Sequence, residues 1–283
     1  MSTLSAGEIM HCHPCFNERA HTQVGRVHLP VAPRCNIRCA FCERRVCANI
    51  TVQHPGWAQK LMAPAQAVDR VRDLAHQHPQ ERFVVGVAGP GDPLANPGTF
   101  EALAAVHAEF PHLLKCISTN GLLLEEKLPD LLRVGVCALT VTMNAPDGAV
   151  GERIYRWVRV GDTLYRGRAA ADLLIARQCA GIRAALTAGL AVKVNTVLVP
   201  SINGPHIARL AALLRDLGVR LMNIMPLIPA GLLHAEPTPT CEELRRARAE
   251  CEAFIPQFRA CEHCSADVVR FPRGGEEGKR RRG

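Results

Sequence analysis

Short runs of consecutive apolar residues recur along the chain, and longer amphipathic segments separate them. Six of these runs predict β-strands that are covered on both faces, because such strands show continuous rather than alternating hydrophobicity. Strands that alternate with helical segments are typical of a parallel sheet. The predicted strands are Val27–Val31, Phe83–Ala88, Leu114–Ser118, Ala138–Met143, Ala191–Val199 and Leu221–Met225.

The segments between the strands predict helices, and their ends carry residues that commonly begin or end a helix. Pro64 and Pro205 suit a first helical turn, while Gly135, Gly189 and Gly218 suit the position after the last turn. The predicted helices are Pro64–His78, Thr99–Glu109, Leu122–Val134, Asp172–Ala188 and Pro205–Leu217.

This alternation predicts an α/β core over residues 27–229, with cysteine-bearing extensions at 1–26 and 230–283. A chain of 283 residues with 48% hydrophobic residues can bury a sizeable core. Part of the net charge of +8 lies in the tail Lys279–Arg282, which is expected to be solvated and disordered. The rest favours an anionic ligand or an acidic partner. An aromatic content of 4% argues against a stacking surface for nucleic acid.

The cysteine usage and the absence of targeting signals predict a cytoplasmic protein. Met1–Met10 lacks a basic start followed by an apolar stretch, and no run reaches the roughly 18 apolar residues that a membrane span needs. Thirteen cysteines in the cytoplasm would stay reduced. Those that occur in groups therefore predict metal or cluster ligation.

The most distinctive group is Cys35, Cys39 and Cys42, which follow the first predicted strand within eight residues. Three thiolates this close can bind three irons of one cubane. Zinc is the alternative, but it favours a fourth Cys or His. The spacing, with Phe41 before the last cysteine, resembles the radical S-adenosylmethionine (SAM) superfamily. The resemblance implies a partial TIM barrel of six βα units, in which the fourth iron binds SAM and an electron cleaves it to a 5′-deoxyadenosyl radical.

Polar and glycine residues at or just after the predicted strand ends predict the SAM pocket, because such ends line the crevice of α/β folds. The run after the second strand resembles the glycine motif that contacts the methionine amino group, although glycine and proline clusters also mark ordinary turns. The expected SAM-binding residues are Gly89, Pro90, Gly91, Asp92, Ser118, Asn120, Asn144, Asn195 and Met225.

Further motifs narrow the resemblance to the NifB family of nitrogenase cofactor biosynthesis proteins. They are His13-Pro14-Cys15, His28, Cys47-Ala48-Asn49, Lys115–Gly121, Asn223–Ile228 and Cys261–Asp267. Their order and spacing together carry the resemblance. It implies an enzyme that fuses two [4Fe–4S] clusters into an eight-iron core. One SAM molecule donates a methyl group that becomes the inserted carbide, a second supplies the radical, and an extra sulfur is added.

The resemblance also implies two sets of ligands for the substrate clusters. They are His28, Cys47 and Cys116 for one cluster, and Cys15, Cys261 and Cys264 for the other. An imidazole in place of a thiolate gives a weaker ligand, which suits a cluster that must later be released.

Each ligand set has an alternative. His28 could be a core histidine, and Cys116 could be a small core side chain. Cys12, Cys15, Cys261 and Cys264 form two pairs with the spacing of a zinc ribbon. Cys137, Cys179, Cys241 and Cys251 are expected to be core residues.

The sequence departs from the family near Cys47. The stretch from Cys42 to Cys47 is one residue shorter than usual, and Ile50 stands where the family has an acidic residue. Glu43 could compensate, or the first cluster site could be altered.

The family's common cofactor-carrying module after the barrel is missing, so the product would leave on a separate carrier. The resemblance also implies a cluster donor and an electron donor such as ferredoxin or flavodoxin. Two other functions stay open: a radical SAM enzyme with auxiliary clusters that acts on another substrate, and a non-catalytic iron–sulfur scaffold or carrier.

Overall fold

The main element of the structure is a curved sheet of seven strands, six of them parallel. In this computed structural model residues 4–272 are described, so the expected disordered tail Lys279–Arg282 lies outside the described residues. The strand order is β11-β10-β7-β6-β5-β1-β12, and β12 is antiparallel to β1. The strands are β1 Gly25–His28, β5 Phe83–Val87, β6 Lys115–Thr119, β7 Val136–Thr142, β10 Ala191–Leu198, β11 Met222–Pro226 and β12 Val269–Arg270.

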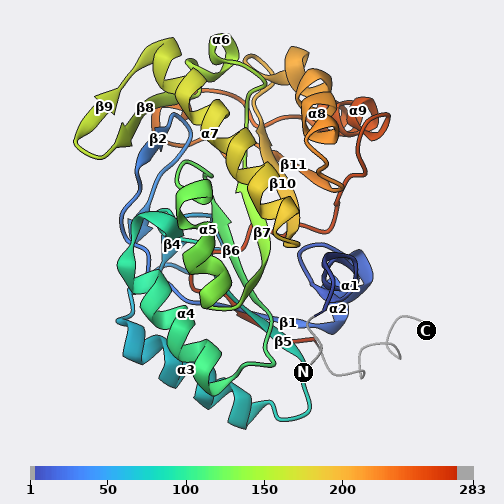
Figure 1. Cartoon of the computed structure of the whole chain (residues 1–283). Coiled ribbons are helices and arrows are strands. Elements are labelled where there is room, and N and C mark those ends of the chain that lie inside the picture. Colours follow the sequence, from blue (N-terminus) through green and yellow to red (C-terminus); the bar gives the residue numbers. More distant parts are fainter. Residues whose placement is uncertain (1–3, 273–283) are drawn as a thin grey trace.

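Helices follow the strands along the outside of the curved sheet (Figure 1). The helices that connect consecutive core strands are α3 Pro64–Gln77, α4 Pro97–Glu109, α5 Leu124–Arg133, α7 Gly167–Thr187 and α8 Ile207–Asp216. All six predicted strands and all five predicted helices are present, and the α/β partial barrel is confirmed. Helix ends differ in detail: Pro205 lies in a 3-10 turn before α8, and α7 begins earlier than predicted, at Gly167.

Several elements were not predicted. The smaller ones include a three-stranded sheet of β2, β8 and β9 and a two-stranded ladder of β3 and β4. The unpredicted helices and strands outside the seven-stranded sheet are α1 Ala6–Cys12, α2 Glu18–Gln23, β2 Ile37–Cys39, β3 Arg45–Val46, β4 Trp57–Ala58, α6 Gly148–Gly151, β8 Tyr155–Val160, β9 Thr163–Tyr165 and α9 Cys241–Glu252. The unpredicted 3-10 turns are η1 Pro93–Ala95, η2 Gly204–His206 and η3 Gly231–Leu233.

Both cysteine-bearing extensions pack onto the barrel core. The front extension places α1 against β7 and β10, and Ile9 and Phe16 share a hydrophobic cluster with Ala138 and Leu221. The back extension returns to the β1 edge of the sheet, where β12 pairs with β1 through Val27 and Val269. Both extensions are therefore packed against the partial barrel.

The strand register aligns inward-facing positions in a row across the sheet. His28 lies beside Gly86, Gly86 beside Cys116, and Cys116 beside Ala138. Side chains alternate between the two faces of a strand, so residues in register share a face. This row places a histidine and a cysteine from different strands on the same side of the sheet.

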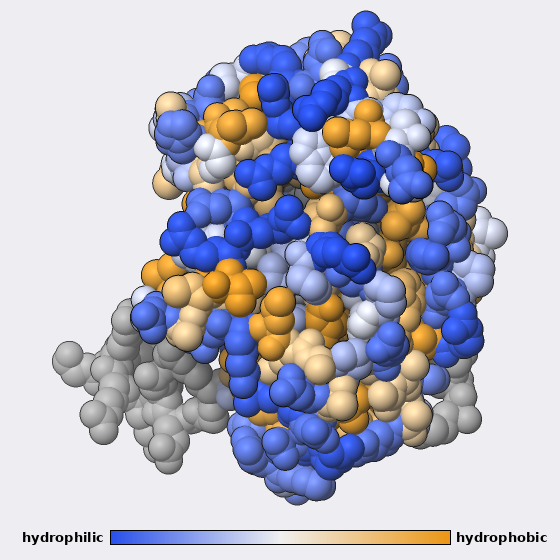
Figure 2. All heavy atoms as spheres, turned by 90° about the vertical axis from the view of Figure 1, so that its left-hand side faces the viewer, coloured by the Kyte–Doolittle hydropathy of each residue, from blue (hydrophilic) through white to orange (hydrophobic). Residues whose placement is uncertain are grey.

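The exterior is mainly polar. On the face shown in Figure 2, hydrophilic side chains surround separate small groups of apolar ones. Within residues 4–272 no helix combines the length and the hydrophobicity needed to cross a bilayer.

Candidate active site

The three cysteines of the predicted triad line one cavity, here called the triad cavity. Cys39 ends β2, which is held by antiparallel pairing with β8, and the Cys42 N–H donates to the Cys39 carbonyl at 3.1 Å. Burial raises the pKa of Cys35 to about 11 and also raises the pKa values of Cys39 and Cys42. Thiolates in this position therefore need a cation or metal beside them.

The glycine motif supports the cysteine loop by close backbone contact. The Gly91 N–H donates to the Ala32 carbonyl at 2.6 Å, and the Asp92 N–H donates to the Arg34 carbonyl at 2.9 Å. A Cβ atom at Gly91 would collide with the Arg34 carbonyl. Gly89 has a φ of +134°, which side chains rarely allow. The missing side chains thus let the motif seat the loop that carries the triad.

Asp92 holds the next strand end in place. Its buried carboxylate accepts from Thr119 Oγ1 at 2.9 Å and from the Asn120 N–H at 2.6 Å, and burial raises its pKa to about 6. Asn120 in turn donates through Nδ2 to Asn36 Oδ1 at 2.7 Å, and Nδ2 lies 3.7 Å from Cys35 Sγ. Asp92 is therefore a positioning residue that acts on the triad through Asn120.

Asn144 offers an unused donor to the triad cavity. Its side chain is fully buried, and its Oδ1 accepts from the Val197 N–H at 2.8 Å. Its Nδ2 has no hydrogen-bond partner among the described residues. Buried donors are rarely left unpaired, so this amide fits a polar ligand in the cavity.

The expected SAM-binding residues separate into two groups. Pro90, Gly91, Asp92, Ser118, Asn120, Asn144 and Met225 line the triad cavity. Gly89 is buried and lines neither cavity, and Asn195 lines a second cavity, where its Nδ2 lies 3.8 Å from Met225 Sδ.

The second cavity brings together five of the six expected substrate-cluster ligands. They are Cys15, His28, Cys116, Cys261 and Cys264, and they come from both extensions and from two core strands. A Cβ atom at Gly86 would lie 2.9 Å from Cys116 Sγ and 3.2 Å from His28 Cδ2. Glycine at this position therefore leaves space between the two side chains.

Cys47 is the exception. It follows β3, its N–H donates to the Ala58 carbonyl at 3.1 Å, and its side chain is exposed. It lines neither cavity, whereas Glu43 lines the triad cavity. Glu43, the carboxylate that could compensate for Ile50, therefore lies near the triad and not beside His28.

His28 has the orientation of a metal-ligating histidine. Its Nδ1 lies 3.0 Å from the Ser265 carbonyl oxygen. A carbonyl only accepts, so Nδ1 carries the proton and Nε2 keeps its lone pair. Metal-ligating histidines commonly donate their second ring N–H to a carbonyl in this way. The arrangement favours the ligand role over that of a core histidine.

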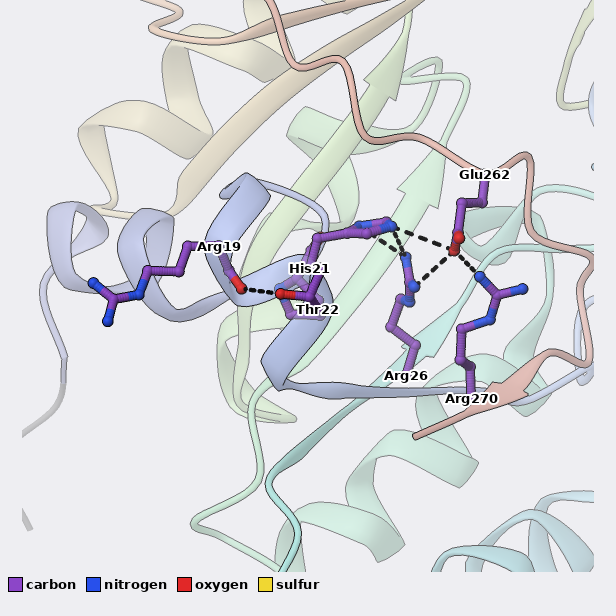
Figure 3. A network of polar contacts seen from close by, with 7 residues as sticks. Arg19, His21, Thr22, Arg26, Glu262 and Arg270 are labelled. Atoms are coloured by element: carbon purple, nitrogen blue, oxygen red, sulfur yellow. Dashed lines mark hydrogen bonds and ion pairs between the residues drawn. The ribbon is translucent and has the colours of Figure 1, made fainter. Parts of the chain in front are cut away.

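The second cavity also contains two buried cations that sequence reasoning missed, Arg26 and Lys193. Arg26 donates to Glu262 at 2.9 Å and to His21, and Glu262 also pairs with Arg270 (Figure 3). Lys193 Nζ donates to the Cys15 carbonyl at 2.7 Å. The available signal for Lys193 was a charged residue within the predicted strand Ala191–Val199.

The two cavities adjoin each other. Six residues line both of them: Pro55, Ala88, Ser118, Thr142, Met225 and His263. His263 also has a φ of +52°, which is uncommon for a residue with a side chain. A ligand in the triad cavity would therefore lie next to one in the second cavity.

The zinc alternatives receive no support. Cys12 lines a different cavity, with Val24 and Leu114, and not the one that holds Cys15. Among residues 4–272 no three Cys, His, Asp or Glu side chains converge on one metal ion. A zinc ion needs all its ligands at about 2.0–2.3 Å from one atom, whereas a cubane binds each thiolate at a different iron.

Comparisons with known proteins identify the class. The model of the radical SAM superfamily matches residues 29–214. SuiB of Streptococcus suis, solved with bound S-adenosylmethionine, shares the fold with a TM-score of 0.60 at 12% identity, over 86% of this chain and 52% of that chain. The structure of anSMEcpe with bound AdoMet gives a TM-score of 0.52 at 13% identity, over 73% of this chain and 52% of that one. The chain is a member of the radical SAM superfamily.

Sequence relatives identify the family. The FeMo cofactor biosynthesis protein NifB of Methanocaldococcus infernus is 45% identical, over 92% of this chain and 86% of its own length. The protein of the same name from Klebsiella pneumoniae is 42% identical, over 91% of this chain and 56% of its own length. The chain belongs to the NifB family of FeMo cofactor biosynthesis proteins, and the predicted resemblance is confirmed.

Membership in the superfamily brings a [4Fe–4S] cluster and SAM as cofactors. The triad cavity fits them, because three thiols line it and Asn144 Nδ2 is a buried donor without a partner among the described residues. Gly91 has no side chain that would collide with the loop carrying the triad. Cys35, Cys39 and Cys42 would hold the cluster.

Proposed function

We propose that this protein assembles the eight-iron core of the nitrogenase cofactor from two [4Fe–4S] clusters, a carbide derived from a SAM methyl group and an extra sulfur. The two cavities share a wall of six residues, and this common wall supports the proposal most directly. Family membership supports the reaction class. A radical generated in the triad cavity would have only a short path to a methylated cluster in the second.

In the triad cavity, we assign cluster binding to Cys35, Cys39 and Cys42. The bound cluster would supply the electron that cleaves SAM. Asn120 and Asn144 would orient the cofactor, and Asp92 would keep Asn120 in place through its hydrogen bond to the backbone. Burial of these groups would exclude water from the radical chemistry.

In the second cavity, we assign substrate-cluster binding to the two expected ligand sets. The set of Cys15, Cys261 and Cys264 is already together in the cavity. The other set has His28 and Cys116 there, and Cys47 would join it from its exposed loop when a cluster binds. The weaker imidazole ligand would allow that cluster to be surrendered during fusion.

Partner proteins follow from the chemistry. The reaction consumes two preformed clusters and electrons, and its product must reach nitrogenase assembly. We therefore propose a cluster donor, an electron donor such as ferredoxin or flavodoxin, and a separate carrier for the product, all in the cytoplasm.

The test is anaerobic reconstitution of the full chain, followed by iron analysis and SAM cleavage. Three cubane units predict about twelve irons per chain. Near four irons with zinc present would contradict the proposal. Three clusters without SAM cleavage would indicate a scaffold or carrier. Cleavage without an eight-iron product, when donor clusters are supplied, would indicate a radical SAM enzyme with another substrate.

A further inference from the structure

Lys193 is a buried ammonium group in the wall of the second cavity. Its side chain is 2% exposed, and it extends from β10 on the same face as Asn195. Its one hydrogen bond goes to the carbonyl of Cys15 at 2.7 Å. The rings of Phe16 and Phe258 lie 5.4 and 4.7 Å from Nζ.

This cation has no acidic partner. No carboxylate within residues 4–272 lies at ion-pair distance from Lys193, and Glu262, the acid that lines the same cavity, is bound by Arg26 and Arg270. A methionine of similar length would pack between the two phenylalanine rings without desolvating a charge. Retention of an ammonium here therefore points to an anionic occupant of the cavity.

The neighbouring side chains indicate which anion. Lys193 lines the same cavity as Cys15, Cys116 and Cys261, and its Nζ lies within hydrogen-bond distance of the Cys15 carbonyl. A cubane bound by thiolates is an anion, and it gains further negative charge when it is reduced. The cavity is therefore lined both by sulfur and nitrogen ligands and by this cation.

We propose that Lys193 is the counter-charge for an anionic iron–sulfur cluster in the second cavity and that it raises the reduction potential of that cluster. This inference rests on the proposed function, because it assumes that a substrate cluster binds there. Lys193 is a positioning and charge-compensating residue, and its hydrogen bond to Cys15 couples it to one of the expected ligands.

Lys115 provides a matched control. It is also buried, at 1% exposure, but its Nζ donates to the carbonyls of Phe110, Pro111 and Leu113, at the end of β6 away from the cavities. Lys115→Met removes the same charge from an equally buried site outside the second cavity. Any general effect of losing a buried lysine should appear in both variants.

The experiment compares reconstituted full-length wild type with Lys193→Met, Lys193→Gln, Lys193→Arg and Lys115→Met in a redox titration followed by electron paramagnetic resonance. The triad cluster is the internal reference. We expect Lys193→Met and Lys193→Gln to lower the potential of the cluster assigned to Cys15, Cys261 and Cys264 by about 59 mV, a tenfold change in its reduction equilibrium. Lys193→Arg should recover most of this shift, and Lys115→Met should cause none.

The Gln and Arg variants separate charge from hydrogen bonding, because both can donate to the Cys15 carbonyl and only one keeps the charge. If Lys193→Met does not fold, this pair still decides the question. Unchanged potentials in Gln, or equal shifts in Gln and Arg, would overturn the counter-charge role. Absence of any second-cavity cluster in the wild type would instead overturn the proposed function.

Discussion

His28 and Cys116 face each other across Gly86, the residue that lies between them in the register of β1, β5 and β6. A Cβ atom at Gly86 would lie within 3.2 Å of both side chains. The space between an imidazole and a thiol is thus fixed by the absence of a third side chain.

Gly86→Ala should therefore damage the second cavity selectively. The added methyl group would push Cys116 or His28 aside and reduce the iron held there, with a stability cost of about 1–3 kcal/mol. The measurement is iron content together with SAM cleavage, which depends on the triad cavity. Gly204→Ala is the control, because its nearest neighbour would be 4.0 Å away. Equal iron in both variants would contradict the prediction.

Variants of the triad should have the opposite effect. Cys35→Ala, Cys39→Ala or Cys42→Ala should abolish reductive SAM cleavage and remove about four irons per chain, because one cubane loses its support. The clusters of the second cavity should persist, since their expected ligands lie on other segments. Loss of all iron in any one of these variants would show that the two sites are not independent.

Cys47 can be tested by thiol labelling. It is exposed, so in cluster-free protein it should react with iodoacetamide faster than Cys116, whose pKa is raised by burial. If it joins His28 and Cys116 as a ligand, cluster loading should protect it at least tenfold. Cys241 was expected in the core, but it is exposed at the start of α9, so it should react equally before and after loading. An unprotected Cys47 would remove it from the ligand set.

The zinc alternative makes a different prediction for Cys12. This residue lines a separate cavity, and its Sγ lies 3.7 Å from the Ile9 carbonyl. Cys12→Ser should therefore keep the metal content of the wild type, whereas Cys15→Ser should lose a cluster. Equal loss of metal in both variants would instead support a zinc ribbon formed by Cys12, Cys15, Cys261 and Cys264.

The sequence was sufficient to predict the core strands and the position of His28, because strand alternation and strand ends are local patterns. It could not place Cys47, whose position depends on the two-residue ladder of β3 and β4, for which the residues carry no periodic signal. It also missed β12, since two residues are too few for a hydrophobic pattern. Asn195 was expected beside SAM, but the structure turns it toward Met225 in the second cavity.

Pulsed electron paramagnetic resonance of reduced protein containing ¹⁵N-labelled histidine can test whether the second cavity binds an iron–sulfur cluster through His28. Nδ1 of His28 is occupied by the Ser265 carbonyl, so Nε2 should couple to the cluster. We predict a ¹⁵N signal that is distinct from the amino nitrogen of bound SAM and disappears in His28→Ala, while the signal of the triad cluster remains. A spectrum that is the same in wild type and His28→Ala would show that His28 does not bind a cluster.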